Sequence, residues 1–245
     1  IIEWKEKLLE KGFYDIISSR CYTSDKLYDC QNREDNIKIG KIKDTKFITI
    51  TTPCRIGRDI NCMIKKSSDC SPGIKCPLCY FTQRKLDTIC SAINKIELYD
   101  LEHGFIIIPN AFPYLENHFL ITVDEHKTQF EILNNSSIEL LNNIKFLLSN
   151  NLNAVIFFNG MCGNSLEHFH CQITTTQFPI FNHLPSNDGL IDTNGFRGWF
   201  INFHYTDDTK FNDMIKKLEH KSYNFIINLH DEHYQCIFFI RNNCE

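Results

Sequence analysis

The segment 164-NSLEHFHCQIT-174 places His168, His170 and Gln172 at every second position. In an extended strand alternate side chains point to the same face, so these three polar groups would share one face. The residues between and after them are apolar and would pack into a core: Phe169, Cys171 and Ile173. We therefore predict a strand here whose polar face is a working surface.

The composition indicates a folded protein with a substantial core. The chain has 245 residues, and 42% of them are hydrophobic. Acidic residues number 30 and basic residues 26, which gives a formal net charge of −4, and the charges are scattered along the chain. This balance argues against binding to duplex nucleic acid or to an anionic membrane.

Hydrophobic runs in the sequence are short. The longest fall well below the roughly 18 to 20 residues needed to cross a bilayer. The opening stretch 4-WKEKLLEK-11 is charged and lacks the apolar centre of a signal peptide. We expect a cytoplasmic protein, and because the chain starts at Ile1 rather than Met, the question of a targeting segment ahead of it stays open.

The order of the expected elements indicates an α+β protein with a mainly antiparallel sheet and flanking helices. Residues 1–75 are expected to form an N-terminal helix and an irregular or β segment that packs on the core. Residues 76–245 are expected to form that core with its C-terminal strands, as one continuous domain with the first part. The patterns predict strands at 104–110, 118–123, 154–160, 198–205, 223–229 and 234–241, and helices at 135–151 and 210–221.

Cys76-Pro-Leu-Cys79 stands apart among the 12 cysteines because the two thiols are three positions apart on a turn-rich loop. Structural zinc sites usually present their first two thiolates in this way, and distant histidines would supply the other two ligands. A redox dithiol normally opens a helix in a thioredoxin-like unit, a pattern that this sequence lacks. A zinc site is favoured, with a redox pair or ordinary core cysteines as alternatives.

The residues ahead of the predicted strand are suited to binding an anion. Gly160 and Gly163 allow tight turns, so backbone amides near Asn164 and Ser165 could converge on a phosphate. A neutral histidine beside them is a competent nucleophile near pH 7, and Gln172 could donate a hydrogen bond to a phosphate oxygen without titrating. By spacing alone, the two histidines of the strand are as often metal ligands or hydrogen-bonded polar residues.

His168-Phe-His170-Cys-Gln172, preceded by Gly163-Asn164-Ser165, resembles the His-x-His-x-Gln motif of one branch of the histidine-triad superfamily. This nucleotidyltransferase branch contains galactose-1-phosphate uridylyltransferase, the diadenosine tetraphosphate phosphorylases and the GDP-galactose phosphorylases. The hydrolases of the superfamily carry a third histidine where Gln172 stands. The resemblance therefore implies a histidine-triad-like fold and favours transfer over hydrolysis.

Three further stretches carry the resemblance in the same chain order. The segment 109-PNAFP-113 resembles the Asn-x-Phe-Pro segment that holds the nucleoside, and 118-HFLITVDEH-126 is similar to a His-x-Leu strand followed by a second histidine. The Cys-x-x-Cys pair matches that of the uridylyltransferases, where zinc is also held by a histidine in a turn and by the first histidine of the motif. The implied ligands of a structural zinc are Cys76, Cys79, His126 and His168, with His118 as the substitute for His126.

The resemblance implies a ping-pong nucleotidyltransferase or phosphorylase with a covalent nucleotidyl-histidine intermediate. His170 would be the nucleophile and Gln172 would contact the phosphate or the leaving group. The partners would be a nucleotide or sugar nucleotide and a phosphate-bearing acceptor, and the chain could form a homodimer. A hydrolase, or an inactive zinc-stabilised nucleotide-binding module, is the alternative. The implied nucleotide-binding residues are Asn110, Phe112, Asn164 and Ser165.

The chain also departs from the family pattern. It is shorter than a full uridylyltransferase, and the first 70 residues match no segment of these relatives. The phosphorylases generally lack the zinc cysteines, so the sequence mixes features of two subfamilies. The resemblance therefore does not define the base or the acceptor.

Overall fold

The computed structural model describes the elements that position the candidate site. The described residues are 37–42, 45–50, 76, 78–79, 99–110, 115, 118–150, 153–160, 166–193, 196–219 and 221–241. The helix expected near the N-terminus lies outside these residues, as do Phe112, Asn164 and Ser165. The division of the chain at residue 75 stays a prediction.

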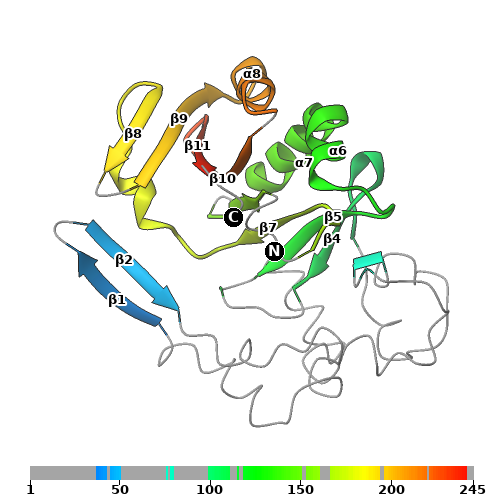
Figure 1. Cartoon of the computed structure of the whole chain (residues 1–245), viewed down its shortest axis with the longest axis horizontal. Helices are drawn as coiled ribbons and strands as arrows, with labels where there is room; N and C mark the ends of the chain where they lie inside the picture. Colours follow the sequence, from blue (N-terminus) through cyan, green and yellow to red (C-terminus); the bar gives the residue numbers. More distant parts are fainter. Residues whose placement is uncertain are drawn as a thin grey trace, which may run out of the picture.

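A nine-stranded antiparallel sheet forms the centre of the molecule (Figure 1). Its strand order is β3-β4-β5-β7-β6-β10-β11-β9-β8, and β1 (Ile37–Ile42) pairs separately with β2 (Thr45–Ile50). The α+β class and the mainly antiparallel sheet are confirmed. The strands of the large sheet are β3 (Tyr99–Asp100), β4 (Phe105–Pro109), β5 (Phe119–Val123), β6 (Val155–Asn159), β7 (His170–Thr174), β8 (Gly189–Thr193), β9 (Phe196–His204), β10 (Ser222–His230) and β11 (His233–Arg241).

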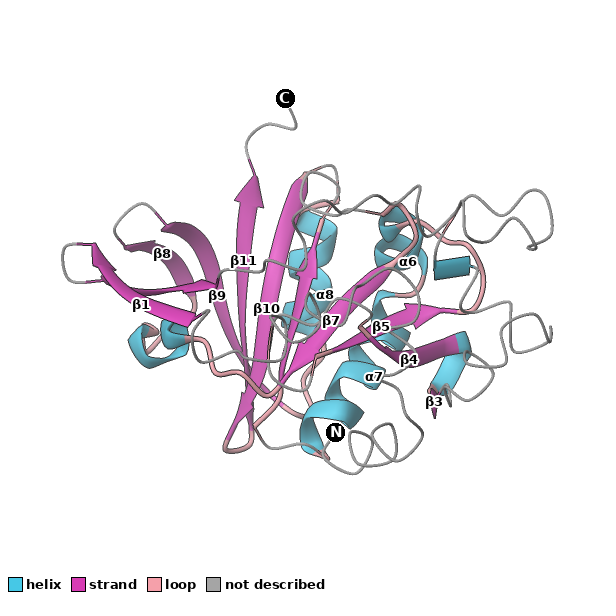
Figure 2. Cartoon of the chain, turned by 90° about the horizontal axis from the view of Figure 1, so that it is seen from below, coloured by secondary structure: helices cyan, strands magenta, loops and turns pink. Residues whose placement is uncertain are grey.

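Helices cover one face of this sheet (Figures 1 and 2). They are α6 (Gln129–Asn135), α7 (Ser137–Ser149) and α8 (Thr209–Lys217). The chain also forms two short 3-10 helices, η4 (Glu102–Gly104) and η5 (Pro179–His183), and Leu78 and Cys79 are helical as well. The apolar side of each α-helix joins one cluster of buried residues with the facing side chains of the strands. In the described part of the chain, every helix is too short or too polar to span a membrane.

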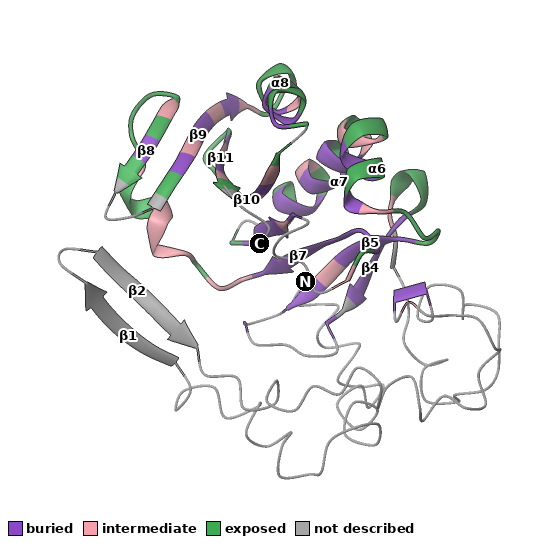
Figure 3. Cartoon of the chain, viewed as in Figure 1, coloured by how far each residue is buried: buried purple, intermediate pink, exposed green. Residues whose placement is uncertain are grey.

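Strand β7 shows the alternation that its sequence predicts. Phe169, Cys171 and Ile173 belong to the cluster under the helices, so His170 and Gln172 point to the opposite face. All five residues of the strand are nevertheless buried (Figure 3). The two polar side chains therefore lie in a partly enclosed site and not on an open surface.

Helix α6 is absent from the elements predicted from the sequence. Its N-cap, Thr128, accepts a hydrogen bond from the backbone N–H of Glu131, and the Glu131 carboxylate accepts one from the backbone N–H of Thr128. This is a capping box, and its Thr-x-x-Glu pattern was visible in the sequence. The helix has only seven residues, which is too short to produce a clear periodic pattern.

Gly160 follows β6 at a point of very close backbone approach. A Cβ atom at this position would lie 2.2 Å from the carbonyl oxygen of Tyr223 in β10, so the two segments could not keep their spacing. Gly189, in β8, has no atom within 4 Å of the same hypothetical Cβ.

We expect Gly160→Ala to lower the free energy of unfolding by about 2 to 3 kcal/mol, because the added methyl group must push β6 away from β10. Urea denaturation measures the change. Gly189→Ala is the matched control, and a Gly160→Ala protein as stable as this control would contradict the predicted clash.

Candidate functional site

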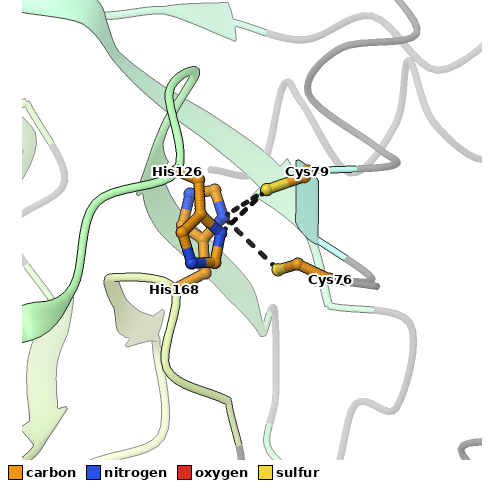
Figure 4. A group of neighbouring side chains, drawn as sticks. All are labelled: Cys76, Cys79, His126 and His168. Carbon is orange, nitrogen blue, oxygen red and sulfur yellow. Dashed lines mark hydrogen bonds between the residues drawn. The ribbon is translucent and has the colours of Figure 1, made fainter. Parts of the chain in front are cut away.

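Two thiols and two imidazoles converge beside the start of β7 (Figure 4). They belong to Cys76, Cys79, His126 and His168, and one ligand atom from each lies within 4.8 Å of all the others. His168 Nδ1 lies 3.5 Å from Cys76 Sγ and 3.3 Å from Cys79 Sγ, and His126 Nδ1 lies 3.0 Å from Cys79 Sγ. Sulfur and nitrogen ligands on a tetrahedral zinc are about 3.5 Å apart, so this donor set has the spacing of a zinc site.

The hydrogen bonds of His168 orient its ring for metal binding. Nε2 lies 3.0 Å from the carbonyl oxygen of Val123, which can only accept, so Nε2 carries the proton. The lone pair is therefore on Nδ1, the atom that faces the thiols. A backbone carbonyl in this position is the usual outer partner of a metal-binding histidine, because it holds the tautomer and the ring plane.

Burial shifts the pKa values of two residues of this cluster, His168 and Cys79. It lowers the pKa of His168 to about 4, with the nearby His126 and His170 adding to the effect, so the ring is neutral at pH 7. Burial, followed by the neighbouring Cys76, raises the pKa of the Cys79 thiol to about 12. The imidazole is ready to coordinate a cation, whereas Cys79 must first lose its proton.

A hydrogen bond from one ring nitrogen of His170 determines which nitrogen carries the proton. Its Nδ1 donates a hydrogen bond to the carbonyl oxygen of His168 at 2.9 Å, so the lone pair of the neutral ring is on Nε2. The side chain is 8% exposed. His168 thus presents its ring to the thiols. His170, two residues further along the chain, presents its ring to the face of the sheet away from the helices.

Gln172 is held by a histidine that directly precedes the neighbouring strand β5. His118 Nε2 donates to Gln172 Oε1 at 2.8 Å, and Asn110 Nδ2 lies 3.4 Å from His118 Nδ1 and 3.1 Å from His118 Nε2. All three side chains are buried. Because the amide oxygen of Gln172 accepts from His118, the amide NH2 group (Nε2) points away from His118.

The structure brings together most of the residues singled out in the sequence. Cys76, Cys79, His126 and His168 form the cluster with metal-ligand spacing, whereas the substitute ligand His118 lies with Gln172 and Asn110 instead. Asn110, expected at the nucleoside, contacts His118 in this buried group. The part played by His118 was missed, because only the pairing of β5 with β7 places it beside Gln172.

Solved structures of other proteins have a fold similar to that of this chain. Yeast Ap4A phosphorylase Apa2 in complex with AMP has a TM-score of 0.52 and 14% identity, covering 87% of this chain and 77% of that chain. The same enzyme in complex with Ap4A has a TM-score of 0.50 and 16% identity over the same shares. A DUF4931 family protein from Bacillus cereus has a TM-score of 0.43 and 17% identity, covering 59% of this chain and 85% of that chain. The chain has the histidine-triad-like fold that its motifs predict.

A family model places the chain more narrowly. Residues 35–175 match the family described as Domain of unknown function (DUF4922), and the chain belongs to this family. The match contains both cysteines of the cluster and the whole His-x-His-x-Gln segment. A search of curated proteins finds no match to the chain.

Proposed function

We propose that the protein is a nucleotidyltransferase or phosphorylase that acts on a nucleotide or sugar nucleotide through a nucleotidyl group carried on His170. The observation that supports this most directly is the 2.9 Å hydrogen bond from His170 Nδ1 to the His168 carbonyl, which leaves the lone pair on Nε2. The fold shared with an enzyme solved in complex with AMP and with Ap4A supports a nucleotide as the donor.

The reaction would proceed in two balanced steps. His170 Nε2 attacks the α-phosphorus, a P–N bond forms, and the P–O bond to the leaving group breaks with its electron pair staying on the leaving oxygen. The proton stays on Nδ1 and keeps its hydrogen bond to the His168 carbonyl oxygen, and this bond stabilises the positive charge that develops on the ring. An oxygen of the phosphate-bearing acceptor then attacks the same phosphorus, a P–O bond forms, and the P–N bond breaks with its electron pair returning to Nε2, which restores the neutral imidazole.

Gln172 would assist by donating from Nε2 to a phosphate or leaving-group oxygen. Its amide does not titrate, so it supplies no proton of its own to a departing group. The resemblance favours transfer to an acceptor over hydrolysis, because the hydrolases of the superfamily carry a third histidine where Gln172 stands. Asn110, Phe112, Asn164 and Ser165 are proposed to contact the nucleotide.

Zinc would be structural in this proposal. The four clustered residues leave no open position on a tetrahedral ion, so bound zinc would tie the segment at 76–79 to the strand that carries His170. The two imidazoles beside the thiols support a metal site over a redox dithiol, which has no need of them.

Intact mass measurement tests the proposed function. The protein is incubated with nucleoside triphosphates, dinucleoside polyphosphates and sugar nucleotides, and its mass is recorded at mildly alkaline pH. One donor is expected to add the mass of one nucleoside monophosphate, which phosphate or a sugar phosphate then removes. Nucleotide breakdown without an acceptor would indicate a hydrolase, and tight binding without any adduct would indicate a binding module.

We expect His118→Ala to slow formation of the adduct by about 10- to 100-fold, because Gln172 Oε1 loses its buried donor and the amide is no longer held. His118→Gln, which can keep a donor near the position of Nε2, should recover part of the rate. The rate is measured by quenched-flow mass spectrometry with saturating donor. An unchanged rate in His118→Ala would show that Gln172 needs no such support.

A further inference from the structure

Asn224 in β10 makes a hydrogen bond that lies outside the apolar core and outside the cluster of Cys76, Cys79, His126 and His168. Its Oδ1 accepts from the backbone N–H of Gly160 at 3.0 Å, directly after β6 ends. This bond uses the oxygen of the amide and fixes the plane of the group. Nδ2, with two N–H donors, therefore has a defined direction, and within the described residues it has no hydrogen-bond partner.

Asn224 shares the face of the sheet that carries His170. Its neighbours Tyr223 and Phe225 both belong to the cluster under the helices, so Asn224 points to the opposite face, as His170 does. Asn224 is the register partner of Asn159 in β6, and Phe158 is the partner of Cys171 in β7. The end of β6 thus separates Asn224 from His170, and two strand spacings amount to about 10 Å.

The two sides of β7 carry different groups. Asn110 and His118 lie on the side of β4 and β5, where the nucleoside is proposed to bind. Asn224 lies on the other side, beyond β6. A phosphorus atom on His170 Nε2 has its nucleoside on one side, so the group that leaves or attacks must come from elsewhere. The β6 and β10 side offers a neutral donor there that is held in place, the Asn224 amide.

We infer that Asn224 Nδ2 binds a phosphate oxygen of the acceptor, or of the equivalent leaving group, over β6 and β10. The inference rests on the proposed function and adds the location of the second substrate. The Gly160 N–H orients the amide, so little conformational freedom is lost when the phosphate binds. The ligand class is a phosphate ester or pyrophosphate. The two N–H donors of the amide can bind phosphate oxygens, and the amide itself is neutral.

Two substitutions separate the acceptor and donor atoms of Asn224. Asn224→Ala removes both, whereas Asn224→Asp keeps an oxygen for the Gly160 N–H and replaces the NH2 group by an anionic oxygen. Asn228→Ala is the matched control, because Asn228 is an asparagine on the same face of the same strand, four residues further on.

The first measurement is discharge of the preformed adduct at increasing concentrations of inorganic phosphate. We expect the half-saturating concentration to rise about tenfold or more in Asn224→Ala. The rise should be larger in Asn224→Asp, and the rate at saturation should change much less. A purely structural role for Asn224 predicts the reverse order, with Asn224→Asp close to the wild type, and that result would overturn the inference. Equal values for wild type, Asn224→Ala and Asn228→Ala would also overturn it.

The second measurement requires no turnover. Calorimetry with inorganic pyrophosphate should show at least about tenfold weaker binding to Asn224→Asp than to the wild type and Asn228→Ala. Hydrogen exchange at the Gly160 amide should stay slow in Asn224→Asp, which shows that the strand end is intact. If the wild type forms no adduct, the proposed function fails, whereas normal discharge and pyrophosphate binding in both Asn224 variants refute this inference alone.

Discussion

A His170→Ala protein should form no nucleotidyl adduct, with a loss of at least about 1,000-fold in any transfer activity. The reason is that Nε2 is the atom expected to form the bond to phosphorus. His168 cannot take over, because its Nδ1 faces the thiols and its Nε2 donates to the Val123 carbonyl. The measurement is intact mass after incubation with the donor that labels the wild type.

Two controls make this expectation specific. His230→Ala removes an exposed histidine at the far end of β10 and should leave the labelling unchanged. Donor binding to His170→Ala, measured by calorimetry, should persist, because the alanine removes a nucleophile and not the nucleotide contacts. Full labelling of His170→Ala would assign the nucleophile to another residue and would refute the proposed chemistry.

The strand that carries His170 was predictable because its signal is local. A period of two in 164–174 defines which side chains face the core, and Phe169, Cys171 and Ile173 lie there as expected. The Cys-x2-Cys spacing is local too. The histidines that complete the cluster are 47 and 89 residues from Cys79, and residue spacing alone did not identify them. The resemblance to the uridylyltransferases identified both.

Long-range pairing explains what the sequence did not reveal. The roles proposed for His118 and Asn224 depend on β5 lying beside β7 and β10 lying beside β6, and strand order cannot be read from alternation. Gly160 was interpreted as a residue that frees a turn. The structure adds a second reason for it, because the carbonyl of Tyr223, 63 residues further along the chain, leaves no room for a side chain.

Zinc removal should have the second large effect. We expect one zinc per chain, and Cys79→Ser should weaken zinc binding by more than about 100-fold, because Cys79 Sγ lies within 3.3 Å of both imidazoles. The metal would join segments that are 92 residues apart at Cys76 and His168, so its loss should also lower the melting temperature. Elemental analysis and thermal denaturation measure the two effects.

His118→Ala is the matched control for the metal. His118 was the substitute ligand in the sequence, and the structure places it with Gln172, so this variant should keep its full zinc content. Full zinc content in Cys79→Ser, or loss of zinc in His118→Ala, would show that the metal site is composed differently.

The pH dependence follows from the two shifted groups. The metal-free protein should lose stability as pH falls from about 6.5 towards 4. In the unfolded chain the pKa of His168 is near its ordinary value of 6.5, whereas in the fold it is about 4, so the unfolded chain takes up the proton first.

Zinc binding should depend on pH through Cys79. Above that pH range His168 is already neutral and releases no proton when zinc binds. Cys79, with its pKa raised to about 12, must give up its proton to coordinate the ion. Zinc affinity should therefore rise with pH between about 6 and 8, with release of at least one proton per zinc, and calorimetry in buffers of different ionisation enthalpy would measure that release directly.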